Sequence, residues 1–236
     1  MSGARCLIVI PAHDEEESLP RTIAEVRDLA PEFDLLVVDD GSRDATGAVA
    51  RALCVPVVRH VVNLGVGGAL QTGFRYALAR GYQAAVQLDA DGQHDPADLA
   101  VLVEPVLAGR FDVSIGSRYR TPTGYQAPAT RRLGMRLFSA VTGLAIGNAI
   151  ADTTSGFRAY SRGVMEAFQH DLPHDFPDAP LLIALARSGF RLCEVPAHMR
   201  ERRAGRSFYT LGKSLYYPYK NLLASLMAML RRPQAR

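Results

Sequence analysis

The chain alternates between short apolar runs and longer segments in which apolar residues recur every three or four positions. Short apolar runs are typical of buried strands, and the longer spacing is typical of helices with one buried face. The predicted strands are residues 6–10, 34–38, 55–59, 83–88, 111–115 and 191–195. The predicted helices are residues 18–29, 44–53, 68–80, 96–107, 131–146, 178–189 and 211–230. This alternation predicts an α/β fold with a mostly parallel sheet, flanked by helices on both faces.

Two of these helices carry start signals. Ser18 is a candidate N-cap for the first helix, and Asp95 for the helix whose first residue is Pro96. The last helix, 211–230, is amphipathic and contains Pro218, where we expect a kink.

Polar residues gather directly after four of the predicted strands. They follow Ile10, Val38, Leu88 and Ile115. Ligands of parallel sheets bind beyond the carboxyl ends of the strands, where the connecting loops meet. We therefore expect the functional site at this edge of the sheet.

Asp89-Ala90-Asp91 is the candidate metal-binding pair at this edge. On an extended chain, residues i and i+2 point to the same side, so the two carboxylates are expected to converge. Converging carboxylates are costly without a cation, and hard oxygen ligands suit Mg²⁺ or Mn²⁺ together with a diphosphate. Gln93 and His94 follow on the same turn as further candidate ligands. The alternative is an Asp-Gly turn, starting at Asp91, with solvated acids.

Asp39-Asp40-Gly41-Ser42 stands between a predicted strand and a helix in the same way. Acidic groups there can accept hydrogen bonds from a base or a ribose, and Gly41 permits close approach of the backbone. The alternative is a strand-to-helix turn in which Asp44 caps the helix. The loop after the first strand has the same character and the same two interpretations.

The segment 63–68 is rich in glycine but matches neither common phosphate-binding motif. Leu70 stands where the dinucleotide motif needs glycine, and no GK[ST] sequence is present. We expect a turn that enters the next helix, with Gly67 close to a ligand.

The composition is that of a globular protein, with 48% hydrophobic and 22% charged residues. A net charge of +3 over 236 residues does not favour a nucleic-acid partner. The charge is unevenly placed, because residues 200–236 hold nine basic residues and one acidic residue, leaving −5 on residues 1–199. This asymmetry favours cation binding in the body and anion binding near the C-terminus.

The planar guanidinium of arginine can donate two parallel hydrogen bonds to phosphate oxygens. Arg118, Arg131, Arg132 and Arg158 flank the expected site in sequence, although each alone reads as a solvated surface residue. Residues 200–209 interleave basic, small and aromatic side chains and are a stronger candidate for a phosphate-binding loop. A solvated basic loop before a helix is the alternative.

The three cysteines, Cys6, Cys54 and Cys193, are scattered as in proteins of reducing compartments. We see no leader and no apolar run of about 18 residues, and we expect a cytoplasmic protein. Residues 211–230 are expected to lie in a membrane interface, to dock on a small membrane protein, or to pack on the body of the protein.

Taken together and in order, these motifs resemble glycosyltransferase family 2 with the GT-A fold, in its branch of dolichol-phosphate mannosyltransferases and bacterial polyprenyl-phosphate glycosyltransferases. The resemblance is carried by Ile10-Pro11-Ala12-His13-Asp14-Glu15, Val37-Val38-Asp39-Asp40-Gly41-Ser42, Asp89-Ala90-Asp91-Gly92-Gln93-His94-Asp95-Pro96, Gly116-Ser117-Arg118, Thr154-Ser155-Gly156-Phe157-Arg158 and the segment 202–207. We predict a catalytic domain over residues 1–210 and a basic amphipathic helix and tail over residues 211–236.

The resemblance implies roles for individual residues. Pro11, Ala12, Glu15 and Asp40 are expected to hold the base and ribose, and Asp14, Ser42, Gly67 and Ala90 to line the same donor site. Asp89 and Asp91 are expected to form the metal pair, with Asp91 on the metal and Gln93 assisting. Arg118, Arg131 and Arg202, joined by Ser207, are expected to contact the donor diphosphate or the acceptor phosphate. The sequence departs from the family at Asp14, where Asn is frequent, and at Val66, where Lys is common.

The implied reaction is inverting transfer of a sugar from a UDP- or GDP-sugar to a polyprenyl phosphate at the inner face of the membrane, with Mg²⁺ or Mn²⁺. An ionised phosphate acceptor needs no strong general base, whereas a hydroxyl acceptor does, and Asp152, Asp175 and Asp178 are the candidates for one. Two alternatives remain: a family 2 transferase acting on a hydroxyl acceptor through an acid such as Asp178, and a non-catalytic nucleotide- or membrane-binding module.

Overall fold

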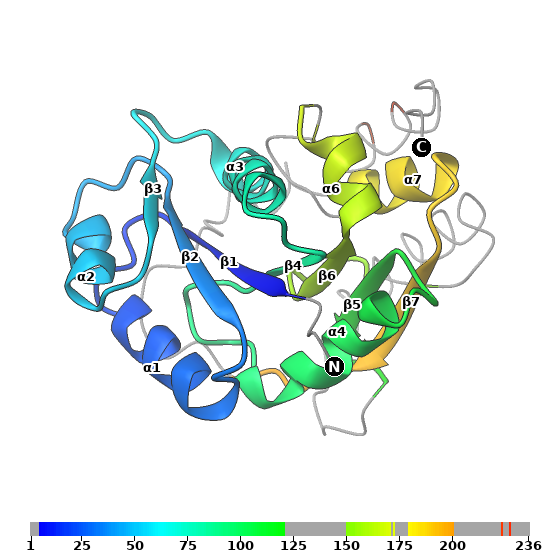
Figure 1. Ribbon diagram of the computed structural model, residues 1–236, viewed down its shortest axis with the longest axis horizontal. Helices are drawn as coiled ribbons and strands as arrows, with labels where there is room; N and C mark the ends of the chain where they lie inside the picture. The colour runs from blue at the N-terminus through cyan, green and yellow to red at the C-terminus, as the bar shows by residue number, and fades with distance from the viewer. Residues whose placement is uncertain are drawn as a thin grey trace.

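The computed structural model describes residues 5–120, 150–170, 172, 179–200, 223 and 227. Within them, seven strands form one sheet in the order β3-β2-β1-β4-β6-β5-β7 (Figure 1). The strands are β1 (Cys6–Ala12), β2 (Asp34–Asp39), β3 (Val57–Arg59), β4 (Ala84–Gln87), β5 (Val113–Ser117), β6 (Arg158–Ser161) and β7 (Leu192–Pro196). All neighbours pair in parallel except β6, which is antiparallel to both β4 and β5.

Helices cover both faces of the sheet, as predicted. They are α1 (Leu19–Leu29), α2 (Thr46–Ala52), α3 (Gly65–Ala79), α4 (Leu99–Leu107), α6 (Arg162–Phe168) and α7 (Ala179–Arg187), with a short 3₁₀ helix η1 (Pro96–Asp98) before α4. Figure 1 shows α3, α6 and α7 on one face and α1 and α4 on the other. The sheet is therefore the middle of three layers.

The strand sequences are apolar throughout because both faces of the sheet are buried. In β1, Leu7 and Val9 pack into the core under α3 and α6, whereas Ile8 and Ile10 pack into the core under α1 and α4. All four side chains have no exposed surface. Successive residues of one strand thus supply both cores, as the period of two of a strand requires.

The six predicted strands are present, with ends that differ by up to two residues from those expected, and β6 and α6 were missed. The sequence of β6, Arg-Ala-Tyr-Ser, is not an apolar run, so the pattern predicted no strand there. Residues 131–146, predicted to be helical, lie outside the described residues. Of the predicted helix 211–230, only Leu223 and Met227 are described, and both are helical.

Of the two predicted caps, that of Asp95 is confirmed, because its carboxylate accepts a hydrogen bond from Ala97 N at the start of η1. Ser18 occupies the N-cap position of α1 but makes no capping hydrogen bond. Its hydroxyl donates instead to the carbonyl and the carboxylate of Glu15. The Ser18 side chain therefore stabilises the loop before the helix.

Candidate active site

The polar loops meet at one edge of the sheet, as the sequence predicted. The parallel strands β1, β2, β4 and β5 end there at Ala12, Asp39, Gln87 and Ser117. The antiparallel strand β6 begins at the same edge, since Arg158 pairs with Gln87. The Gly156-Phe157 segment before β6 thus joins the site from the opposite chain direction.

Hydrogen bonds tie the loop after β1 to the loop after β2. Asp14 N donates to Ser42 Oγ (3.1 Å), and Arg43 N donates to Asp14 Oδ1 (2.7 Å). Glu15 N donates to Thr46 Oγ1 (2.8 Å). Three of the predicted donor-site residues, Asp14, Glu15 and Ser42, are therefore neighbours.

The backbone conformation of Asp14 explains why Asp can stand where the family frequently has Asn. Its φ is 54°, in the left-handed region, which Asn and Asp adopt far more readily than other residues with a side chain. Asp14 therefore supplies the backbone shape that Asn would supply.

Asp40 is buried, and both of its carboxylate oxygens are engaged within the protein. Oδ1 lies 2.7 Å from His60 Nδ1 and accepts a hydrogen bond from Leu64 N (2.8 Å), and Oδ2 accepts one from Gly65 N (2.8 Å). The far nitrogen of His60 lies 2.8 Å from Thr72 Oγ1. A carboxylate at the start of α3 stabilises the positive end of that helix. Asp40 thus holds the glycine-rich turn, and its predicted contact with a nucleotide stays a prediction.

The glycine-rich turn packs directly on the loop after β2. Gly41 has a φ of +71°, and a Cβ there would lie 2.8 Å from Asn63 N. The turn enters α3 as predicted, although the helix begins at Gly65, before the expected start at residue 68, and Gly67 is buried inside it.

The Asp89–Asp91 segment is a turn, which corrects one step of the sequence argument. β4 ends at Gln87, and Ala90 and Asp91 lie in a turn, so the rule for side chains of an extended chain does not apply. Asp91 Oδ1 accepts a hydrogen bond from Gln93 N (3.1 Å), and Gly92 has a φ of +71°. The Asp-Gly turn proposed as the alternative is present, and a turn is fully compatible with metal binding.

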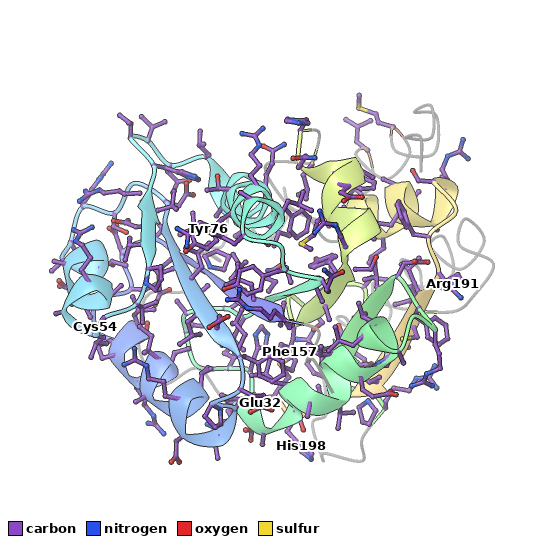
Figure 2. All side chains as sticks on the ribbon, viewed as in Figure 1. Glu32, Cys54, Tyr76, Phe157, Arg191 and His198 are labelled. Carbon is purple, nitrogen blue, oxygen red and sulfur yellow. The ribbon has the colours of Figure 1, made fainter. Side chains whose placement is uncertain are left out.

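The backbone of Asp89 is hydrogen-bonded to a buried histidine. Asp89 N donates to His94 Nδ1 (3.2 Å), which places the ring proton on Nε2, 3.7 Å from Asp89 Oδ2. The His94 ring stacks on Phe157, with centroids 4.9 Å apart and planes at 19°. Figure 2 shows Phe157 near the centre of the molecule. His94, expected from the sequence as a candidate ligand, is instead buried and supports the turn from inside.

The residues present fit a divalent cation held by Asp89 and Asp91. A Cβ at Gly156 would lie 2.8 Å from Asp89 Oδ2, so only glycine lets the Asp89 carboxylate keep this position against the chain. The Asp89 side chain is 38% exposed. Among the described residues no group of three or more His, Cys, Asp or Glu could hold a metal ion. Mg²⁺ sites built from one or two carboxylates and substrate phosphates look like this.

The close packing of Gly156 on Asp89 gives a testable prediction. We expect Gly156→Ala to weaken Mn²⁺ binding about tenfold, because the new methyl group displaces the Asp89 carboxylate, while the melting temperature falls by only a few degrees. Calorimetric titration of Mn²⁺ in the presence of a nucleoside diphosphate measures this. Gly163→Ala in α6 is the control, because its Cβ would meet Phe190 at an ordinary 3.8 Å. Equal Mn²⁺ affinity in both variants would contradict the assignment.

Arg118 lies at the end of β5 and is bound to a buried carboxylate. Its Nε donates to Asp152 Oδ2 (2.8 Å) and its Nη2 to Asp152 Oδ1 (2.7 Å). Burial raises the pKa of Asp152, but the hydrogen bonds and charge of Arg118 outweigh it and hold the pKa below its usual value. Asp152 was one of three candidate general bases. A buried, ion-paired carboxylate is a poor proton acceptor, so the structure does not favour Asp152 in this role.

Arg158 is also not what the sequence indicated. Its side chain is among the largest buried ones, and its Nη2 donates to the Thr153 carbonyl (3.0 Å). Arg158 is therefore neither a solvated surface residue nor an exposed phosphate ligand; it supports the chain that leads into β6.

The remaining candidates divide into two groups. Pro11 and Ala12 lie at the end of β1, Ala90 is buried in the Asp89 turn, and Gln93 is half-buried beside it. Outside the described residues lie Arg131, Arg132, Asp175, Asp178, Arg202 and Ser207. Sequence reasoning assigned no role to His60, which bonds Asp40, or to Gly156, which lies against Asp89. Gly156 lies inside a recognised motif, and Arg200 lies inside the candidate phosphate-binding segment 200–209.

Comparison with known proteins supports the family that the sequence motifs predicted. The model of the family "Glycosyl transferase family 2" matches residues 7–168. An undecaprenyl-phosphate mannosyltransferase of Micrococcus luteus is 39% identical over 86% of this chain and 86% of its own. A polyprenol monophosphomannose synthase of Mycolicibacterium smegmatis is 36% identical over 86% of this chain and 80% of its own.

Among solved structures, the chain is similar to glucosyl-3-phosphoglycerate synthase from Mycobacterium tuberculosis in complex with Mn²⁺ and UDP-glucose. The TM-score is 0.73 and the identity 22%, over 98% of this chain and 81% of the other. The sheet and the helices that flank it therefore have the GT-A fold. The chain belongs to glycosyl transferase family 2, as the motifs predicted, and its activity is glycosyl transfer. In the described part of the chain, no helix has the length and apolar character needed to span a membrane.

Proposed function

We propose that the protein transfers a sugar from a nucleoside-diphosphate sugar to the phosphate of a polyprenyl phosphate, with inversion at the anomeric carbon. The observation that carries the proposal is the similarity to two transferases, both named for a polyprenyl acceptor, over at least 80% of each chain. Both names specify mannose, so mannose is the first sugar to test, and GDP-mannose and the UDP-sugars are the candidate donors.

The acceptor chemistry agrees with what the site supplies. A phosphate monoester is ionised near neutral pH and attacks without a general base. Of the three acids that could serve an acceptor hydroxyl as a base, Asp152 is committed to Arg118, and Asp175 and Asp178 lie outside the described residues. In a direct displacement the phosphate oxygen forms the new bond to the anomeric carbon while the bond to the donor diphosphate breaks.

The donor side of the site rests on the carboxylates and loops described above. Asp89 and Asp91 would hold Mg²⁺ or Mn²⁺, and Gln93 would assist. Such a cation offsets the negative charge that the departing diphosphate gathers. Asp14, Glu15 and Ser42, fixed to one another between β1 and β2, would hold the nucleotide. The structural relative that binds Mn²⁺ and UDP-glucose supports this placement by analogy of fold.

Arginines complete the proposed site. Arg118, Arg131 and Arg202 would contact the diphosphate or the acceptor phosphate, with Ser207 beside them. The acceptor is a lipid, so the protein would work at the cytoplasmic face of the membrane. Residues 211–236, which are basic and amphipathic in sequence, would rest on that surface or on a small membrane protein.

The test is a transfer assay with two acceptors. Purified protein is incubated with GDP-mannose or a UDP-sugar, Mn²⁺, and either undecaprenyl phosphate or undecaprenol in detergent. We expect a glycosyl-phosphoryl lipid, seen by mass spectrometry, only with the phosphate. Transfer to undecaprenol alone would instead support the hydroxyl-acceptor alternative. Donor binding without transfer to either lipid would contradict the proposal and favour a binding module.

A further inference from the structure

The chain that leaves β7 runs beside the turn that carries Asp89 and Asp91. We call residues 197–200 the β7 extension. Met199 pairs with His94 in an antiparallel bridge, and Arg200 N donates to Gln93 O (2.8 Å). Asp95 N donates to His198 O (3.4 Å). A segment about 100 residues further along the chain thus forms one side of the metal-binding turn.

A single guanidinium joins this extension to two other elements. Arg200 Nη1 lies 2.7 Å from Glu25 Oε2 on α1, and Nη2 lies 2.9 Å from Asp95 Oδ2 at the end of the turn. The second oxygen of Asp95 caps η1. The side chains of Glu25 and Asp95 are each only 21% exposed, so removal of the cation would leave two half-buried acids without this shared partner.

Gln93 links the extension to the predicted metal ligand. Its N–H donates to Asp91 Oδ1 (3.1 Å), and its carbonyl accepts from Arg200 N. The Asp91 carboxylate and the Arg200 backbone therefore contact the same residue. On the other side, His198 N and Nδ1 contact the Asp98 carboxylate, so the extension is held along its length.

The basic residues Arg202, Arg203 and Arg206 follow the extension directly in sequence. We propose that Arg200 is a positioning residue for sugar transfer: clamped between Glu25 and Asp95, it fixes where the basic segment begins relative to the Asp89–Asp91 turn. The inference rests on the proposed function, in which this segment contacts a phosphate. Arg200 itself is occupied by two carboxylates, so it acts by holding the chain.

This role predicts a split between donor binding and turnover. Arg200→Gln keeps the backbone bond to Gln93 possible but removes both charge contacts. We expect kcat for transfer from GDP-mannose to undecaprenyl phosphate to fall about 10-fold to 100-fold, because small displacements of positioning groups cost that much. The dissociation constant of Mn²⁺ with GDP is expected to change less than about twofold, because Asp89 and Asp91 are retained. If a UDP-sugar is the active donor, that sugar and UDP are used.

Two further variants separate positioning from general stability. Arg200→Lys should recover part of kcat, because one ammonium can pair with one carboxylate but cannot bridge two. Arg191→Gln is the matched control. Arg191 lies just before β7 and pairs with Asp112 (3.3 Å), whereas Arg200 lies after β7 and pairs with Asp95. Arg191→Gln should keep the wild-type kcat.

The result that overturns the proposal is a kcat in Arg200→Gln within about twofold of wild type, or an equal loss in donor affinity and kcat. A wild type that transfers no sugar to undecaprenyl phosphate refutes the proposed function instead. In that case hydrogen exchange, which needs no substrate, decides the positioning claim. The amide of residue 200 should exchange about tenfold faster in Arg200→Gln than in Arg191→Gln, and equal rates would overturn it.

Discussion

Replacing Asp91 by Asn should lower the rate of sugar transfer by about 10³-fold and abolish Mn²⁺-dependent nucleotide binding, because one of the two carboxylates offered to the cation is lost. The variant should remain folded, since the Asp91 side chain makes a local hydrogen bond to Gln93 N worth about 1 kcal/mol. Steady-state transfer, calorimetric titration of Mn²⁺ with nucleotide, and thermal unfolding measure the three quantities.

The control for Asp91→Asn is Asp28→Asn, which removes one negative charge from the exposed face of α1. It should leave transfer, Mn²⁺ binding and melting temperature unchanged. If Asp91→Asn retains Mn²⁺-dependent donor binding with wild-type affinity, the metal is not bound by this pair and the assignment of the site is wrong.

The largest effect on stability is expected from Arg118→Met. Asp152 is fully buried, and the variant leaves its carboxylate without the guanidinium that it binds through two hydrogen bonds. Breaking a buried ion pair in this way costs about 3–5 kcal/mol of unfolding free energy at neutral pH. Urea denaturation of both proteins measures the difference.

The pH dependence of that difference has a definite sign. In the wild type the pKa of Asp152 is below its usual value, so its contribution is complete at neutral pH and lost only as pH falls through the folded-state pKa. In Arg118→Met, burial is opposed only by the hydrogen bonds from the backbone N–H of residue 118 and from the Thr154 hydroxyl, so the protonated acid is favoured more than in the wild type. The gap between the two proteins should therefore narrow as pH falls towards about 4.

Arg191→Gln again serves as the comparison, because its ion pair with Asp112 involves an arginine side chain that is 54% exposed. Such exposed pairs contribute at most about 1 kcal/mol. A loss in Arg118→Met no larger than in Arg191→Gln, or a loss that does not change with pH, would show that the buried pair does not stabilise the fold as described.

The local pattern of apolar and polar residues was sufficient to predict most strands of the sheet. Apolar runs such as residues 6–10 are strands because only a strand with both faces covered needs side chains of that kind at every position. The position of the site followed as well, since a parallel sheet brings the loops after β1, β2 and β4 to one edge. The apolar-run pattern did not identify β6, because the buried side chains of this antiparallel strand include Arg158.

The internal contacts of the site could not be predicted from local pattern. Arg200 and Glu25 are 175 residues apart, and Arg118 and Asp152 are 34 apart. Each pair consists of ordinary charged residues until the fold brings them together. Asp40 is similar: its motif indicates an acid near a nucleotide, whereas its two oxygens bind His60 and the start of α3. Motifs therefore located the residues, and the fold determined which of them hold the protein together.

The most direct test of the central claim is the location of Mn²⁺ in crystals of the protein with a nucleoside diphosphate, by anomalous diffraction. We predict a manganese ion coordinated by Asp91 or Asp89, with the diphosphate as a further ligand. An ion and a diphosphate bound elsewhere, for instance in the cavity lined by Gln83, Asp112 and Arg162, would contradict the account.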